Sequence, residues 1–132
     1  MNDPTIVRKL EALLDAIGSL KGFSNPDSVA YQIKNPLLIK SFARPGKHNI
    51  DGEGRRIFES SQAGYKACWF DLDIKTRGES RAGLKPDDKL SNLLRVFGLT
   101  ERLGQQQVVK FLRRALLDET ISLDTPLTYF RH

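Results

Sequence analysis

Residues 60–78 read SSQAGYKACWFDLDIKTRG and predict a long helix at the centre of the fold. A serine hydroxyl at position 60 or 61 can cap its N-terminus, and Gly78 provides a stop. Apolar side chains recur at helical spacing in two adjacent stripes, one of Ala63, Ala67, Phe70 and Ile74 and the other of Tyr65, Trp69 and Leu72. A helix that is apolar over so wide an arc is expected to be covered by other elements on most sides.

The segments on either side of this helix predict further helices. Asp3 followed by Pro4 is a typical helix start, and Gly18 and Gly22 indicate that the helix ends within residues 18–21. The remaining helical patterns are a short segment through 30–31, a helix from 86 to 98 and a helix after Gly104. Together they predict a mainly α fold, in which four to five helices pack around one central helix and an ordered turn follows at 123–127.

Residues 34–59, between the first two main helices, form an irregular and basic stretch. Prolines and glycines interrupt it, so it is expected to be a long loop or a small β-hairpin, with short extended pieces at 37–39 and 57–58. It holds six basic residues and three acidic ones, a balance of 6 − 3 = +3 within a chain of net charge +5. Ordered loops of this length are usually functional, so the sequence predicts a binding surface here.

Length and composition limit the possible classes of protein. A chain of 132 residues, 39% hydrophobic and 28% charged, fits a single globular domain over residues 1–132. The basic balance favours anionic partners such as nucleic acid, a membrane surface or an acidic polymer. The N-terminus does not have the pattern of a signal peptide, and no apolar run reaches the ~18 residues of a membrane span. The expected location is therefore cytoplasmic as made, and access to a cell wall would need another export route.

The sequence predicts no metal site and no cofactor. His48, Asp51 and Glu53 lie close together, but their spacing matches no EF-hand or zinc pattern, so we interpret them as a solvated loop. Cys68, the one cysteine, falls in mid-helix with no obvious base, which is typical of a buried structural thiol. No phosphate-binding glycine loop is present.

Three short motifs occur in an order that suggests a family. They are Leu20-Lys21-Gly22-Phe23, Asn35-Pro36, and Phe58 followed by Ala63-Gly64-Tyr65, and they precede the Leu123–Leu127 turn. Over residues 5–127 the chain resembles phage and bacterial lysozyme-like domains of the lytic transglycosylase type. In those sequences a first helix ends in Glu-Gly-Phe, an Asn-Asn-Pro-Gly-Asn loop and a basic or glycine-rich segment follow, and a capped helix begins near Ala-Gly-Tyr. The family's Gly-Asn would fall at positions 37 and 38, where this chain has two leucines.

The resemblance implies an α+β lysozyme-like fold and a glycan-binding groove. It places Lys21 where the family has its catalytic glutamate. That glutamate gives a proton to the glycosidic oxygen, which requires a carboxylic acid of raised pKa, whereas a lysine ionises near ~10.4 and becomes a neutral base when it loses its proton. Glu53 is the carboxylate we would choose as a substitute. The implied substrate-binding residues are Phe23, Asn35, Arg44, Lys47, Arg55, Phe58 and Tyr65.

Three functional hypotheses follow. The leading one is a peptidoglycan-binding or related glycan-binding domain whose glycosidase or transglycosylase activity is weak or lost. The alternative is a basic module for nucleic acid or an acidic protein partner, from a phage or mobile element, in which Phe42, Phe58 and Tyr65 stack on bases. The third is an active enzyme with a relocated carboxylate. Lys21 also has a purely structural explanation, because a lysine at a helix C-terminus meets the negative end of the helix dipole.

Overall fold

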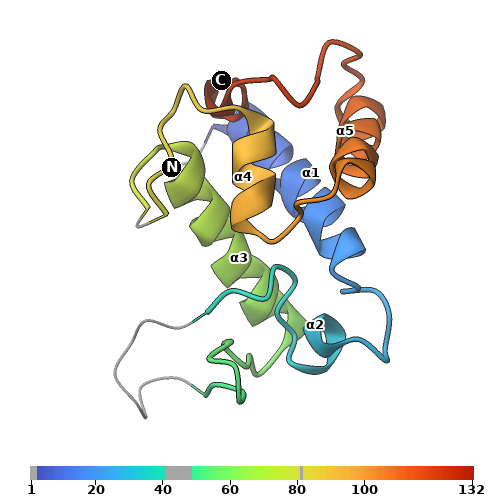
Figure 1. Cartoon of the computed structure of the whole chain (residues 1–132). Helices are drawn as coiled ribbons and strands as arrows, with labels where there is room; N and C mark the ends of the chain where they lie inside the picture. The colour runs from blue at the N-terminus through green and yellow to red at the C-terminus, as the bar shows by residue number, and fades with distance from the viewer. Residues whose placement is uncertain (1–2, 41–48, 81) are drawn as a thin grey trace.

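The computed structural model describes residues 3–40, 49–80 and 82–132, and it is mainly helical (Figure 1). Its elements are α1 (Pro4–Leu20), α2 (Val29–Gln32), α3 (Ser61–Thr76), α4 (Leu90–Val96), α5 (Arg102–Leu116) and the 3-10 helix η1 (Leu127–Arg131). The prediction of a mainly α fold is confirmed. The described residues contain no β-strand, only isolated bridges such as Lys40 to Arg55 and Ile50 to Arg56.

Helix α1 begins and ends as its sequence predicts. The Asp3 carboxylate accepts the backbone N–H of Thr5 at 2.7 Å, and Pro4 occupies the first turn. The helix ends at Leu20, within the expected range, with Lys21 as its C-cap. Its buried face consists of leucines and isoleucine with no exposed surface: Leu10, Leu13, Leu14 and Ile17.

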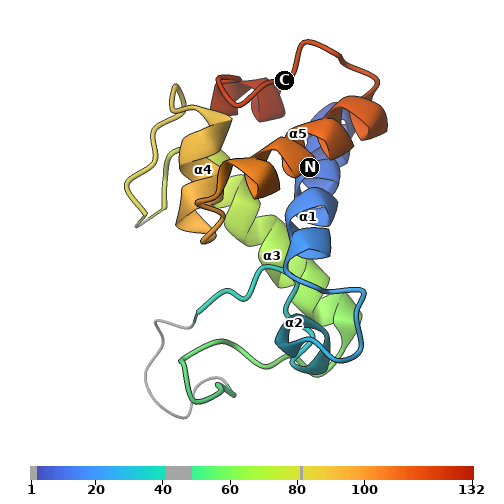
Figure 2. The ribbon, with the colours of Figure 1, turned by 45° about the vertical axis from the view of Figure 1, so that its right-hand side comes forward.

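The helix with the most neighbours is α1, and not α3 as the sequence suggested. Helix α1 packs against α3, α5 and η1, whereas α3 packs against α1 and η1. Figure 2 shows α1 between α3 and α5. The two-stripe interpretation of α3 was wrong, because Phe70 and Ile74 are 46% and 39% exposed while Cys68, Trp69 and Leu72 face the core. Helix α3 therefore carries apolar side chains on its exposed side as well as on the side that faces the core.

Two other helix starts differ from the prediction. Residues 86–88 form a turn, and α4 begins only at Leu90 with Lys89 as its N-cap. Asp88 does not cap α4; its carboxylate stabilises the turn by accepting the Lys85 N–H at 2.8 Å. Helix α5 begins at Arg102, so Gly104 lies inside it.

The N-terminal end of α3 lies against the segment that follows α2. A Cβ atom added to Gly64 would lie 1.7 Å from the backbone oxygen of Lys34, so the two backbones approach more closely than any other residue would permit. Ser60 caps the same end of α3 by accepting the Ala63 N–H at 3.1 Å. The close approach of Gly64 to the Lys34 backbone fixes the position of residues 34–40 relative to α3.

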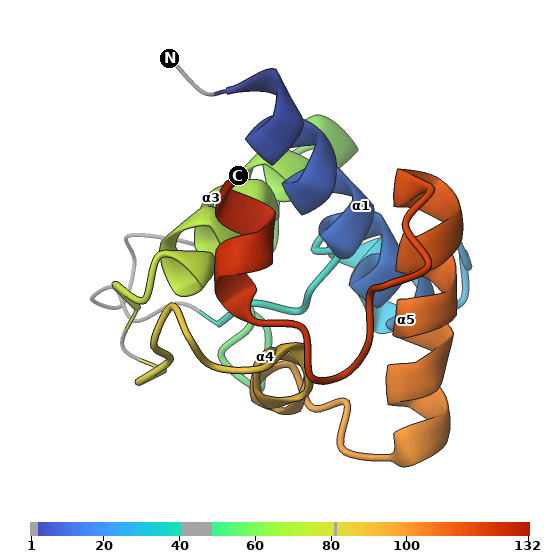
Figure 3. The ribbon, with the colours of Figure 1, turned by 90° about the horizontal axis from the view of Figure 1, so that it is seen from above.

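The C-terminal residues close the other end of the core. Phe130 of η1 is fully buried, and Arg131 donates to the buried Asp73 carboxylate of α3 at 2.6 Å. The other oxygen of Asp73 pairs with Arg77, the C-cap of α3, at 2.9 Å, so this carboxylate bonds both to η1 and to the end of its own helix. Seen from above, η1 lies beside α1 and α3 (Figure 3).

Candidate functional site

A hollow lies between the end of α1, the segment 37–40, the second half of α3 and the end of α4. Its volume is about 710 Å³. Most of its lining is apolar and is formed by Leu37, Leu38, Ile39, Ile74, Val96 and Phe97. Charged side chains line it as well: Lys21, Lys40, Lys75, Asp71 and Glu79. We call this hollow the Lys21 cleft.

Lys21 lies where two helices end. Its backbone caps α1, and its ammonium group reaches Gly98 after α4: a Cβ placed on Gly98 would lie 3.2 Å from Lys21 Nζ. The side chain is partly buried, and this loss of water lowers the pKa of Lys21 below its ordinary value. Two helix C-termini nearby favour a cation at this position, which gives the lysine a structural role beside any role in binding.

The two acidic side chains of the cleft each have a cationic partner. Asp71 pairs with Lys75 at 2.5 Å, and Glu79 lies 3.9 Å from the Arg77 guanidinium. Lys75 also lies over the Phe97 ring, with its Nζ 5.1 Å from the ring centroid. Each carboxylate of the cleft therefore lies beside a cation of this chain.

Asn35, one of the predicted substrate-binding residues, lies inside the protein. It has no exposed surface, and its amide group donates to the backbone oxygens of Ile39 at 2.9 Å and Arg56 at 3.0 Å. Its side-chain oxygen accepts the Ile39 N–H at 3.0 Å and the Cys68 thiol at 3.4 Å. Asn35 therefore holds the 37–40 wall of the cleft in place and has no polar atom left for a ligand.

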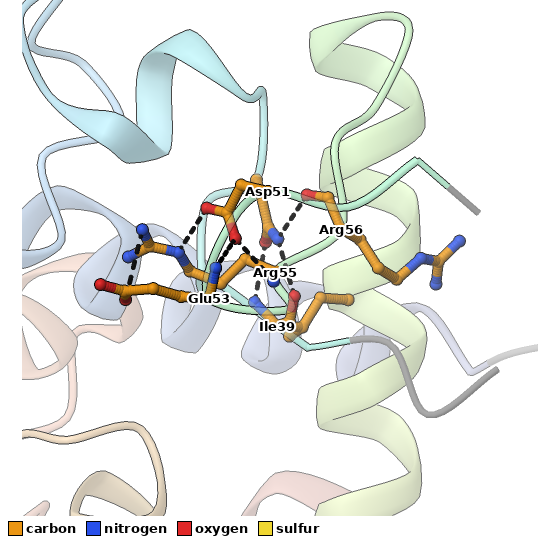
Figure 4. A network of polar contacts seen from close by, with 6 residues as sticks. Ile39, Asp51, Glu53, Arg55 and Arg56 are labelled. Carbon is orange, nitrogen blue, oxygen red and sulfur yellow. Dashed lines mark hydrogen bonds and ion pairs between the residues drawn. The ribbon is translucent and has the colours of Figure 1, made fainter. Parts of the chain in front are cut away.

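Glu53 and Arg55 lie outside the cleft lining, in a compact turn (Figure 4). Asp51 accepts the backbone N–H groups of Glu53 and Arg55 and pairs with the Arg55 guanidinium at 2.7 Å. Glu53 lies 3.4 Å from the same guanidinium, and its side chain is 72% exposed. These hydrogen bonds to Arg55 and Glu53 hold the pKa of Asp51 below its ordinary value, against a raising effect of burial. The acidic residues of this turn thus neutralise its own arginine.

Three other predicted binding residues lie near the start of α3. Phe23 and Tyr65 line a shallower hollow of about 370 Å³, separate from the Lys21 cleft. The Tyr65 hydroxyl donates to Asp15 of α1 at 3.0 Å, and burial together with this bond raises the pKa of Tyr65. The Phe58 ring lies 4.7 Å from the Arg56 guanidinium. The structure therefore brings Phe23 together with Tyr65, in a hollow that Lys21 does not line.

Cys68 has the surroundings of a structural thiol. It is fully buried, and burial raises the pKa of its thiol to about 12. The described residues contain no group of three or more His, Cys, Asp or Glu side chains placed to hold a metal ion. Phe42, Arg44, Lys47 and His48 lie outside the described residues.

Several cleft residues carried no signal at the sequence level. Asp71 and Lys75, at i and i+4, are an ordinary helix-surface pair. Ile74, Val96 and Phe97 match core positions in a helical pattern, and only the fold shows that Ile74 and Val96 are exposed at the cleft. The one available indication was Lys21 itself, through the resemblance of its neighbours.

No protein family, curated protein or solved structure matches the chain. Among the described residues, no helix has both the length and the apolar content that crossing a membrane requires.

Proposed function

We propose that the Lys21 cleft binds a stretch of glycan, such as peptidoglycan, and that this chain has weak or lost glycosidase or transglycosylase activity. The observation that carries the proposal is the position of Lys21. It stands at the end of α1 and lines the cleft, which is where the resemblance to lysozyme-like domains would place the catalytic acid.

The chemistry of the cleft suits a sugar chain with anionic substituents. Sugar rings have apolar faces and polar edges, and the cleft offers an apolar floor with charged groups around it. Peptidoglycan carries free carboxylates on its stem peptides. Lys21 and Lys40 can pair with such groups, because neither has an ion pair with a carboxylate of the described residues.

The backbone of the cleft wall gives further support to the resemblance. Leu38 has a φ of 55°, in the left-handed region that a leucine rarely adopts. Asparagine adopts this region much more readily, and asparagine is the residue that the family pattern would have at position 38. The segment thus takes a conformation that its own sequence does not favour.

Loss of catalysis follows from the side chains that are present. Lys21 replaces a proton donor with a cation, and Asp71 and Glu79 already have cationic partners. General acid catalysis contributes about 10²–10⁴-fold to such reactions, so a cleft with a lysine at the position of the acid is expected to bind more than it cleaves.

The test is sedimentation with insoluble peptidoglycan, combined with a peptidoglycan-clearing assay. We expect the natural chain to bind without clearing and Lys21→Met to bind about tenfold more weakly, because one charge-assisted contact is lost. Lys85→Met, which changes an exposed lysine outside the cleft, is the matched control and should bind normally. Robust clearing by the natural chain would show that the activity is intact, and absence of binding would remove the glycan proposal.

The alternative, a nucleic-acid or acidic protein partner, rested on the basic stretch 34–59. Two of the basic side chains that the structure describes in this stretch already have partners within the chain. Arg55 pairs with Asp51 and Glu53, and Lys34 donates to the backbone oxygen of Glu59 at 3.1 Å. Binding of duplex DNA that weakens by orders of magnitude between low and moderate salt would revive this alternative.

A further inference from the structure

Helix α5 exposes large apolar side chains on the face turned away from α1. Leu103 is 71% exposed, Phe111 40% and Leu117, the C-cap residue, 85%. Figure 3 shows α5 at the edge of the molecule, with α1 on its inner side. Neither the Lys21 cleft nor the hollow beside Phe23 includes a residue of α5, so this face is not part of the site described above.

The same face is strongly basic. Residues 102–117 contain four basic residues and no acidic one. Arg113 donates a hydrogen bond to the backbone oxygen of Ile121 at 2.7 Å, whereas Arg102, Lys110 and Arg114 are exposed. Leu103, Lys110, Arg114 and Leu117 follow one another at spacings of seven, four and three residues, which places them along one line of the helix surface. The acidic residues nearest in sequence, Glu101, Asp118 and Glu119, lie beyond the two ends of the helix, and the Asp118 carboxylate accepts hydrogen bonds from Thr120 and Tyr129.

Leu117 takes an unfavourable backbone conformation. Its φ of 51° and ψ of 44° are left-handed, at a helix end where glycine or asparagine is the usual residue. Its side chain gains almost no burial in return, since 85% of it is exposed. A leucine that is both strained and exposed contributes little to the stability of the chain, which favours a role in binding.

We propose that the outer face of α5 docks on an anionic lipid surface, with Leu103, Phe111 and Leu117 inserted among the lipids and Arg102, Lys110 and Arg114 beside the headgroups. Charge complementarity supports this occupant, because a bilayer with acidic headgroups presents an anionic layer above an apolar one. A second copy of the chain is disfavoured, because two such faces would bring their cations together. A bilayer also needs no complementary groove, and this face is the convex side of a helix.

The test is co-sedimentation of the full chain with vesicles of phosphatidylcholine alone or mixed with phosphatidylglycerol. We expect binding to the mixed vesicles only, weakening as salt is raised. The combined variant Leu103→Gln, Phe111→Gln, Leu117→Asn should bind at least about tenfold more weakly, because it loses the apolar insertion and keeps every charge. The matched control is Val29→Gln, at an apolar residue 42% exposed on α2, which should bind as the natural chain does.

A circular dichroism spectrum and a melting curve for each variant exclude misfolding as the cause of lost binding. Leu117→Asn alone should melt at the same temperature or higher, because asparagine suits the left-handed cap. The proposal is overturned if the natural chain ignores the mixed vesicles at low salt. It is overturned too if the combined variant binds as well as the natural chain, which would indicate attraction by charge alone, or if Val29→Gln loses binding equally.

Discussion

Gly64→Ala is expected to destabilise the fold by about 3–5 kcal/mol, because the added methyl group would meet the closest contact of any glycine that the structure describes. The added Cβ would lie 1.7 Å from the Lys34 backbone oxygen and 2.9 Å from its carbonyl carbon. Both are backbone atoms and cannot rotate away, so either α3 or the segment after α2 has to move. The measurement is the free energy of unfolding from urea denaturation.

Gly104→Ala provides the matched control. Gly104 is also helical, but a Cβ there would meet no atom within 4 Å. Alanine is the better helix former by up to about 1 kcal/mol, so this variant should be neutral or slightly more stable. If Gly64→Ala proved as stable as Gly104→Ala, the close contact between α3 and Lys34 would not exist as described.

Asn35→Ala is expected to cost about 2–4 kcal/mol and to weaken glycan binding as well. The substitution leaves the Arg56 backbone oxygen and the Ile39 N–H without the partner that Asn35 provides, and it leaves the Ile39 oxygen with the Arg56 N–H alone. Since Asn35 has no exposed surface, water cannot replace it unless the loop opens. The 37–40 wall of the Lys21 cleft should then loosen, which calorimetry with soluble peptidoglycan fragments would detect as lower affinity in the folded variant.

Asn25→Ala separates this role from that of an ordinary turn asparagine. The Asn25 side chain also accepts a backbone N–H, that of Asp27 at 3.0 Å, but it is exposed. Loss of that bond should cost below about 1 kcal/mol and leave glycan affinity unchanged. If Asn35→Ala kept full stability but lost glycan affinity, Asn35 would contact the ligand directly, and the internal role derived from its burial would be wrong.

Local signals predicted the elements whose ends depend on local chemistry. Asp3 with Pro4 and Ser60 mark helix starts by direct side-chain bonds to the backbone, and the structure contains both bonds. These features depend on residues within one turn of each other, which is why the sequence alone was sufficient.

Features that depend on distant residues were not predictable in the same way. The stripe of Phe70 and Ile74 has the spacing of a core face, and nothing in α3 itself indicates that it faces the outside. Asn35 has the composition of a loop residue, and its burial depends on Ile39, Arg56 and Cys68 together. Lys21 was identified through the pattern of its neighbours, but its contact with Gly98 joins residues far apart in the sequence.

The central claim is that glycan binds in the Lys21 cleft. The most direct measurement is a titration of the ¹⁵N-labelled chain with soluble peptidoglycan fragments, followed by backbone amide chemical shifts. The account predicts shifts concentrated at Lys21, Leu38–Lys40, Asp71–Lys75 and Val96–Gly98, and their reduction in Lys21→Met. Shifts confined to another surface, or none at concentrations where the chain sediments with peptidoglycan, would contradict it.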